Sequence, residues 1–316
     1  MILMWENEPV ISYEIFQDLF CPREVFSSEN LPCDIEELSE WFASRFLSPY
    51  NSARPFLTAY AGVGYHASVW DMQLSTGLFS LIDHYWVQEE LGQYSWETDN
   101  LFVHEWDEVT VSKFIPKKEG RIFNPSYTTP GNLSKYWVRE QEKFYLYKSH
   151  ELDTQNVYAE RLAYLLGIAL GLSVPSVEIK DNQDKIISFT SLEVEFIPAL
   201  WVKDYFTDDM LMDMHAFDYL IGNEDRHKLN YGVLLDSHKN ISMAPLFDHG
   251  RSLLWRGDPL LSSGITSITS AFYKNLLNID FSSILDEVDL TKKLYQRLLL
   301  FLEKNREGIY NNACVI

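Results

Sequence analysis

The stretch FDYLIGNEDRHKLNYGVLL at 217–235, followed by APLFDHGRSLL at 244–254, carries the densest group of polar side chains in the chain. In each stretch a polar loop adjoins an apolar run of the kind that forms a strand. Asp225, Asn230 and Asp248 fall at the two ends of the hairpin that these runs predict, so their side chains can converge. A carboxylate at Asp225 can accept a hydroxyl proton, and the oxygens of Asn230 and Asp248 suit Mg²⁺.

An upstream strand and helix add a cation and an acid to this set. The run FYLYK at 144–148 is a strand candidate that ends on Lys148. A helix is predicted at 154–171, with a threonine at its start and a glycine at its end, and Glu160 lies on it. An ion pair between Lys148 and Glu160 would hold the lysine toward a phosphate. A strand lysine, a helix glutamate, a D-x-x-x-x-N loop and a D-x-G metal site are the parts of a protein-kinase-like site.

Each of these residues also has an ordinary interpretation. Lys148 alone would be a solvated strand end, and Glu160 alone a solvated helix residue. Asp225 beside Arg226 would be a surface ion pair, which contributes little to stability. The D-H-G tripeptide at 248–250 would be a turn. The occurrence of all of them in this order, each on the expected element, favours a functional site.

Two departures distinguish the chain from ordinary eukaryotic-type kinases. The histidine follows the aspartate in D-R-H at 225–227, and D-H-G at 248–250 replaces Asp-Phe-Gly. The two quoted stretches instead resemble the HipA-like kinase family, which comprises bacterial toxin kinases and relatives that include CtkA-type secreted kinases. The run AERLAYLLGIALGLSVPSVEI at 159–179 also resembles the helix-then-strand signature of that family. The resemblance covers about residues 125–255.

The resemblance implies a role for each matching residue. Asp225 takes the position of the catalytic base, and Asn230 and Asp248 take the metal positions, where they also meet the nucleotide. Lys148 takes the position that contacts the nucleotide phosphates, and Glu160 takes that of the helix glutamate. The cofactors implied are ATP and Mg²⁺.

The loop before the lysine strand is the expected phosphate-binding loop. In HipA-like kinases this loop contacts phosphates and can be autophosphorylated on serine. Here Gly131 would let the backbone approach a phosphate, and Ser134 is the favoured side-chain contact. Ser126, Thr128 and Thr129 are the candidate autophosphorylation sites.

The fold class that we expect is α+β, a bilobal protein-kinase-like fold of HipA type. A small β-rich lobe would span 111–197 and a mostly helical lobe 198–316. Residues 1–110 would form an N-terminal accessory region, which does not resemble the usual N-terminal domain of HipA. The linker between the lobes is expected near Glu195 and Phe196, whose backbone would meet adenine. The other predicted elements are helices at 208–222 and 290–305 and strands at 177–179, 185–190, 231–235 and 241–244.

The predicted reaction is transfer of the γ-phosphoryl group of ATP to a Ser or Thr hydroxyl of a protein. Autophosphorylation and a toxin–antitoxin or phage-related role are left open. One alternative is a pseudokinase that binds a nucleotide and serves as a regulatory interaction module. Another keeps ATP but transfers a nucleotidyl group, or phosphorylates a small molecule. The complete Lys148, Asp225, Asn230 and Asp248 set argues against the pseudokinase.

Composition limits the class of protein and its partners. A chain of 316 residues with 46% hydrophobic and 15% aromatic residues is not globally disordered. A net charge of −20 argues against general binding to nucleic acid or to anionic membranes. The resemblance to HipA-like kinases implies a protein substrate with a Ser or Thr acceptor as partner and leaves open a small antitoxin-type inhibitor. Three cysteines without a C-x-x-C motif, and a start without a signal-peptide pattern, favour the cytoplasm, with secretion as an effector left open.

Overall fold

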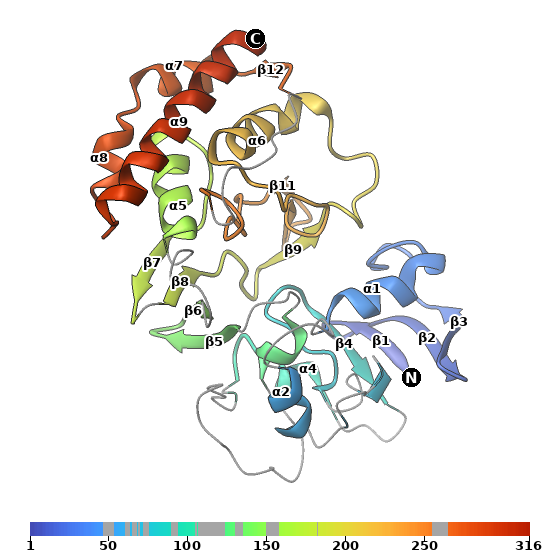
Figure 1. Ribbon diagram of the computed structural model, residues 1–316. Helices are drawn as coiled ribbons and strands as arrows, with labels where there is room; N and C mark the ends of the chain where they lie inside the picture. The colour runs from blue at the N-terminus through green and yellow to red at the C-terminus, as the bar shows by residue number, and fades with distance from the viewer. Residues whose placement is uncertain are drawn as a thin grey trace. The chain divides into compact units, whose positions relative to one another are not determined.

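The structure is a computed structural model of the chain, drawn in Figure 1. The residues that it describes are 1–46, 54–60, 64, 68, 70–71, 76–89, 94–104, 106, 124–129, 135–149, 158–181, 183–254 and 265–316. The chain clusters into two compact units. The first unit comprises Met1–Ser149, Thr190–Ile197 and Leu234–Ile241, and the second comprises His150–Phe189, Pro198–Val233 and Ser242–Ile316.

A four-stranded antiparallel sheet in the first unit has the order β3-β2-β1-β4. Its strands are β1 (Ile2–Trp5), β2 (Glu8–Phe16), β3 (Leu19–Val25) and β4 (Tyr85–Gln88). The tight turns of this sheet put Glu6, Gln17 and Asp18 at positive φ, which matches the twist of a two-residue hairpin turn. These strands are absent from the sequence-based prediction, because neither turn carries the glycine that usually signals a hairpin.

The core of the first unit is largely aromatic. Phe79 and Trp86 stack with their ring centroids 5.5 Å apart, and the cluster consists of Met4, Phe79, Leu81, Trp86, Tyr94, Trp96, Leu101, Phe102 and Phe144. The short helices of this unit are η1 (Ile35–Glu37), α1 (Leu38–Ser44), α2 (Arg54–Tyr60), α4 (Trp96–Asp99) and η2 (Pro125–Thr128). Burial of these rings contributes to the stability of the first unit.

Strands β5 (Lys135–Glu140) and β6 (Lys143–Ser149) form an antiparallel hairpin at the end of the Met1–Ser149 segment of this unit. It confirms the strand predicted at 144–148. Lys148 pairs in register with Lys135, so both side chains project from the same face of the hairpin.

The second unit is mainly helical. Its helices are α5 (Ala159–Ala169), α6 (Asp208–Ile221), α7 (Ser270–Asn278), α8 (Phe281–Leu285) and α9 (Lys292–Asn312). Its short strands are β7 (Val177–Lys180), β8 (Gln183–Ile187), β12 (Ser267–Ile268) and β13 (Cys314–Val315). Helix α9, drawn in red in Figure 1, packs on α6 and α8. The buried face of α6 includes Phe217, Leu220 and Ile221, which are fully excluded from solvent.

The sequence-based elements of the second unit are largely confirmed. The side chain of Thr207 accepts a hydrogen bond from the Met210 amide and caps α6, and Gly222 ends this helix at a φ of 63°. The helix predicted at 154–171 is described from Ala159 onward, and its first expected residues lie outside the described part of the chain. The tail helix α9 is longer than predicted.

Three strands lie where the chain passes between the units: β9 (Val194–Pro198), β10 (Gly232–Asp236) and β11 (Ile241–Met243), in the order β11-β10-β9. One passage between the units falls after Ile197. Residues 150–189, which we expected in the small lobe, cluster with the second unit.

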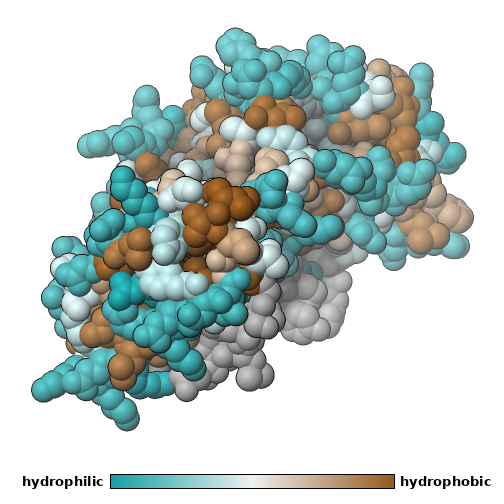
Figure 2. All heavy atoms as spheres, turned by 90° about the horizontal axis from the view of Figure 1, so that it is seen from above, coloured by the Kyte–Doolittle hydropathy of each residue, from teal (hydrophilic) through white to brown (hydrophobic). Residues whose placement is uncertain are grey.

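The surface is largely hydrophilic on the face that Figure 2 shows, with hydrophobic residues in separate patches. Within the described residues, every helix is too short or too polar to cross a membrane. None of the three cysteines forms a disulfide.

Candidate functional site

The polar loop after α6 (222–230), which we call the catalytic loop after the role that we expect of it, begins with a sharp change of direction at Gly222. Hydrogen bonds fix the first residues of this loop. The Asn223 Nδ2 donates to Asp218 Oδ1 at 2.9 Å, and its Oδ1 accepts from the Asp225 amide at 3.1 Å. Asn223 therefore ties the backbone of the expected catalytic base to the end of α6.

Asn230 braces the catalytic loop from its other end. Its Nδ2 donates to the Asp225 carbonyl at 2.6 Å, and its Oδ1 accepts from the His227 amide at 2.9 Å. The side chain is buried, with 2% of the residue exposed. The D-x-x-x-x-N spacing thus closes a compact loop in which Asn230 holds Asp225 directly, so the structure brings together two residues that the sequence pairs.

Arg226 joins this loop to two neighbouring segments. Its Nε and Nη2 donate to the two carboxylate oxygens of Asp218, each at 2.9 Å. Its Nη1 donates to the carbonyl oxygens of Asn230, at 2.7 Å, and of Phe247, at 2.9 Å. Phe247 directly precedes Asp248, so one guanidinium links α6, the 222–230 loop and the segment that carries Asp248.

The pairing of Arg226 corrects the ordinary interpretation of this stretch. Arg226 pairs with Asp218 and not with Asp225, and the exposed fractions of the two side chains are 8% and 9%. A buried, bidentate pair of this kind is strongly directional. Neither Asp218 nor Arg226 is among the site residues that the sequence predicts. The available signal was an acid on the last turns of a helix followed by an arginine in a polar loop, and nothing local shows that the two meet.

Glu160 anchors the loop that carries Asp248. Its carboxylate Oε2 accepts a hydrogen bond from the His249 amide at 3.0 Å, and 2% of the residue is exposed. Gly250 lies against the same carboxylate: a Cβ at that position would be 3.5 Å from Glu160 Oε1. Asp248 itself has a φ of 62°, an uncommon value for a residue other than glycine. The segment is therefore held in a defined turn by a buried acid on α5.

Lys148 lies in the first unit, at the end of β6, and is 5% exposed. The ordinary interpretation of a solvated strand end is therefore wrong for Lys148, and burial equally excludes it for Glu160. The ion pair that we expected between these two residues stays a prediction. Gly131 and Ser134 lie outside the described residues.

The candidate autophosphorylation residues are buried. Exposed fractions are 2% for Ser126, 1% for Thr128 and 5% for Thr129. The Thr128 hydroxyl donates to the Phe79 carbonyl at 2.7 Å, and the Thr129 hydroxyl donates to the Pro125 carbonyl at 2.6 Å. Phosphorylation of any of the three would require this segment to open.

The segment around Glu195 and Phe196 is held within the first unit. The Phe196 amide donates to the Ile82 carbonyl at 2.9 Å. The Glu195 carboxylate accepts from Trp5 Nε1 at 2.6 Å and lies 2.8 Å from His84 Nδ1. The Phe196 N–H therefore already has an acceptor, and the adenine contact stays a prediction.

His84 is the buried centre of this attachment, and both of its ring nitrogens face oxygen acceptors. Nδ1 lies 2.8 Å from Glu195 and 3.0 Å from Glu6, and Nε2 lies 3.1 Å from the Ser191 carbonyl. Burial disfavours the imidazolium form, but the hydrogen bond and negative charge of Glu195 outweigh burial and raise the pKa of His84 above its ordinary 6.5. The protonated ring can donate from both nitrogens.

A raised folded-state pKa predicts the direction of a pH effect. The stabilisation by His84 should be complete below the unfolded-state pKa near 6.5 and should be lost as the pH rises through the folded-state pKa. We expect the difference in melting temperature between the wild type and His84→Gln to shrink steadily on raising the pH from 6 to 9. Thermal melts of both proteins across that range check this. A difference that grows with pH would contradict the assignment.

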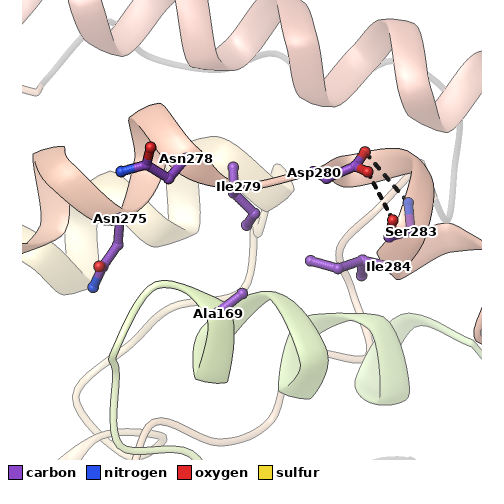
Figure 3. Close-up of a pocket in the computed structure, with 7 residues that line it drawn as sticks. All are labelled: Ala169, Asn275, Asn278, Ile279, Asp280, Ser283 and Ile284. Carbon is purple, nitrogen blue, oxygen red and sulfur yellow. Dashed lines mark hydrogen bonds between the residues drawn. The ribbon is translucent and has the colours of Figure 1, made fainter.

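A cavity of about 300 Å³ lies elsewhere in the second unit, as Figure 3 shows. Its lining residues are Ala169, Asn275, Asn278, Ile279, Asp280, Ser283 and Ile284. Its polar groups serve the fold: Asn275 Nδ2 donates to the Leu170 carbonyl, and Asp280 caps α8 by accepting from Ser282 and Ser283. None of the expected site residues lines this cavity.

Comparison with known proteins gives distant likenesses. No family model and no curated protein matches the chain. Among solved structures, the chain is similar to the Helicobacter pylori proinflammatory kinase CtkA, with 18% identity over 56% of this chain and 91% of that chain and a TM-score of 0.45. It is also similar to a chain of the Shewanella oneidensis toxin–antitoxin complex of HipA, HipB and operator DNA. The identity is 11% over 98% of this chain and 90% of that chain, and the TM-score is 0.46.

Proposed function

We propose that the protein is a HipA-like kinase that transfers the γ-phosphoryl group of ATP to a Ser or Thr hydroxyl of a protein. One observation carries the proposal: Arg226 bonds the catalytic loop, the carbonyl next to Asp248 and helix α6 into one framework. Asp225, Asn230 and Asp248 lie on the segments that this framework joins, and a base, an amide and a second acid are the groups that a kinase site uses. Positioning and charge stabilisation supply most of the catalysis in this chemistry.

The residues divide the work as follows. Asp225 orients the acceptor hydroxyl and takes its proton. Lys148, which Glu160 would brace, positions the phosphates, with the loop around Gly131 and Ser134 as the expected backbone contact. Lys135, opposite Lys148, adds a second positive charge on the same face of the hairpin, where an anion would be stabilised.

The chemistry of Asn230 and Asp248 fits Mg²⁺. Asn230 Oδ1 uses one lone pair for the His227 amide and retains the other. The described residues contain no group of three or more acidic, His or Cys side chains that could hold a metal by themselves. Mg²⁺ bound with a nucleotide needs only one or two protein ligands, since the phosphates and water molecules supply the others. When bound, the ion neutralises charge on the phosphates.

Intact-mass spectrometry after incubation with Mg²⁺–ATP tests the proposal. We expect a gain of one phosphoryl group in the wild type or in a generic acceptor such as myelin basic protein. Asp248→Ala should show no gain. Asp289→Ala, which removes an equal charge from an exposed position of the same unit, should behave like the wild type.

Other outcomes identify the alternatives. A nucleotide-sized gain would show nucleotidyl transfer. No gain, together with saturable nucleotide binding in a titration, would favour the pseudokinase. Activity retained in Asp248→Ala would overturn the metal assignment.

A protein acceptor and a small antitoxin-type inhibitor are the partners that we propose. The HipA structure to which the chain is similar was solved with HipB and operator DNA, and this is a property of that complex. For this chain, the absence of nucleic-acid binding is a prediction from its net charge of −20. A titration of the protein into labelled duplex DNA at 50 and 200 mM salt checks it.

A further inference from the structure

Arg251 makes a direct contact with the expected catalytic base. Its Nη1 donates to Asp225 Oδ1 at 2.7 Å. The exposed fractions of the two side chains are 41% and 32%, so the pair faces solvent, where an acceptor would approach. Among the described residues, Arg251 is the one side-chain partner of the Asp225 carboxylate, and Oδ2 accepts no hydrogen bond from them.

The backbone that carries Arg251 is fixed on both sides. The His249 amide is held by buried Glu160, and the Ser252 hydroxyl donates to the His249 carbonyl at 2.6 Å. Ser252 is fully buried. The Asp225 backbone is equally fixed, because Asn223 and Asn230 bind its amide and carbonyl. The Asp225 side chain, by contrast, can still turn about its own bonds, and Arg251 is the group that restrains it.

We propose that Arg251 is a positioning residue for the phosphoryl transfer, an inference that rests on the proposed function. The guanidinium holds Oδ1 and so presents Oδ2 to the acceptor hydroxyl. In the step itself, the hydroxyl proton passes to Oδ2 while the hydroxyl oxygen bonds to the γ-phosphorus. The bond from that phosphorus to the β–γ bridging oxygen breaks, and ADP leaves with its electron pair.

The position of Arg251 also couples two parts of the site. It lies three residues after Asp248, on the turn that Glu160 anchors. A correctly placed metal-binding turn therefore sets the orientation of the base. As a half-exposed ion pair it contributes little to stability, so we assign it to the orientation of Asp225 and not to folding.

The test measures the rate of phosphoryl incorporation from [γ-³²P]ATP at saturating Mg²⁺–ATP, into the chain itself and into myelin basic protein. Arg251→Ala should fold normally, bind Mg²⁺–ATP with unchanged affinity and transfer phosphate about 10- to 100-fold more slowly. Arg251→Lys should recover part of the rate, because an ammonium group can donate to Oδ1. Lys274→Ala, an exposed change of the same charge in the same unit, should match the wild type.

The outcomes are separable. An inactive wild type overturns the proposed function and this inference with it. An active wild type with an equally active Arg251→Ala overturns the inference alone. The inference also fails if Arg251→Lys transfers phosphate no faster than Arg251→Ala. It fails as well if the loss appears only in the KM for the acceptor, since Arg251 would then recognise the substrate.

Discussion

The Asp225→Asn variant is expected to bind Mg²⁺–ATP like the wild type and to transfer phosphate about 10²- to 10⁴-fold more slowly, the range that a general base contributes. The amide is nearly the same size as the carboxylate, so Arg251 can still donate to its oxygen. The loop hydrogen bonds of the Asp225 backbone, which its amide donates to Asn223 and its carbonyl accepts from Asn230, do not involve the side chain that changes. What is lost is the carboxylate that accepts the hydroxyl proton.

Two measurements on one preparation check this result: nucleotide affinity by titration calorimetry and transfer rate from radiolabelled ATP. An unchanged circular dichroism spectrum and melting temperature serve as the folding control. If the variant transfers phosphate within a factor of about three of the wild type, a general base at this position is excluded. If it loses nucleotide binding as well, Asp225 belongs to the nucleotide site and not to the acceptor.

The elements next to the site could be predicted because their signals are local. Helix α6 has a threonine cap and ends at a glycine, and its apolar face repeats with helical spacing. Strands β6, β10 and β11 are short runs rich in apolar residues, and polar residues adjoin each run. The D-x-x-x-x-N spacing is itself a local constraint, since Asn230 reaches the Asp225 carbonyl across one turn of chain.

The parts that escaped prediction depend on contacts between distant segments. Sheet β3-β2-β1-β4 joins β4 to residues more than 70 positions earlier, and its turns lack glycine. The attachment of Glu195 to Trp5 and His84 spans 190 and 111 positions. The periodic spacing of apolar residues along the chain does not predict such long-range contacts, because burial and hydrogen bonding select them only in the folded chain.

The 190–197 segment, on which we expect adenine to bind, is attached to N-terminal residues of the first unit. This segment is covalently flanked on both sides by residues of the second unit, yet Thr190, Glu195 and Phe196 are bonded to the first. An N-terminal region that merely extended the chain would leave this segment unattached. Residues of the first unit therefore hold the segment on which we expect adenine to bind.

The Arg226→Ala variant is expected to lose about 3–5 kcal/mol of unfolding free energy, the cost of leaving one member of a buried ion pair alone. Among the described residues, the Asp218 carboxylate would keep only the side-chain amide of Asn223 as a side-chain partner. The Asp218 side chain is 9% exposed, so its charge would stay largely buried. The Asn230 and Phe247 carbonyls would lose a shared donor at the same time. Transfer activity should fall with stability, because the catalytic loop and the Asp248 segment would no longer be joined.

Urea denaturation followed by circular dichroism measures this loss, since the long helices lie in the second unit. Arg251→Ala is the matched control: it also removes an arginine from an aspartate, but from a pair that is 41% and 32% exposed, and should cost at most about 1 kcal/mol. Arg226→Lys should fall between the two, because one ammonium cannot reproduce the two-pronged contact with Asp218 while also reaching both carbonyls. A loss in Arg226→Ala no larger than that of the control would mean that the framework does not hold the site together.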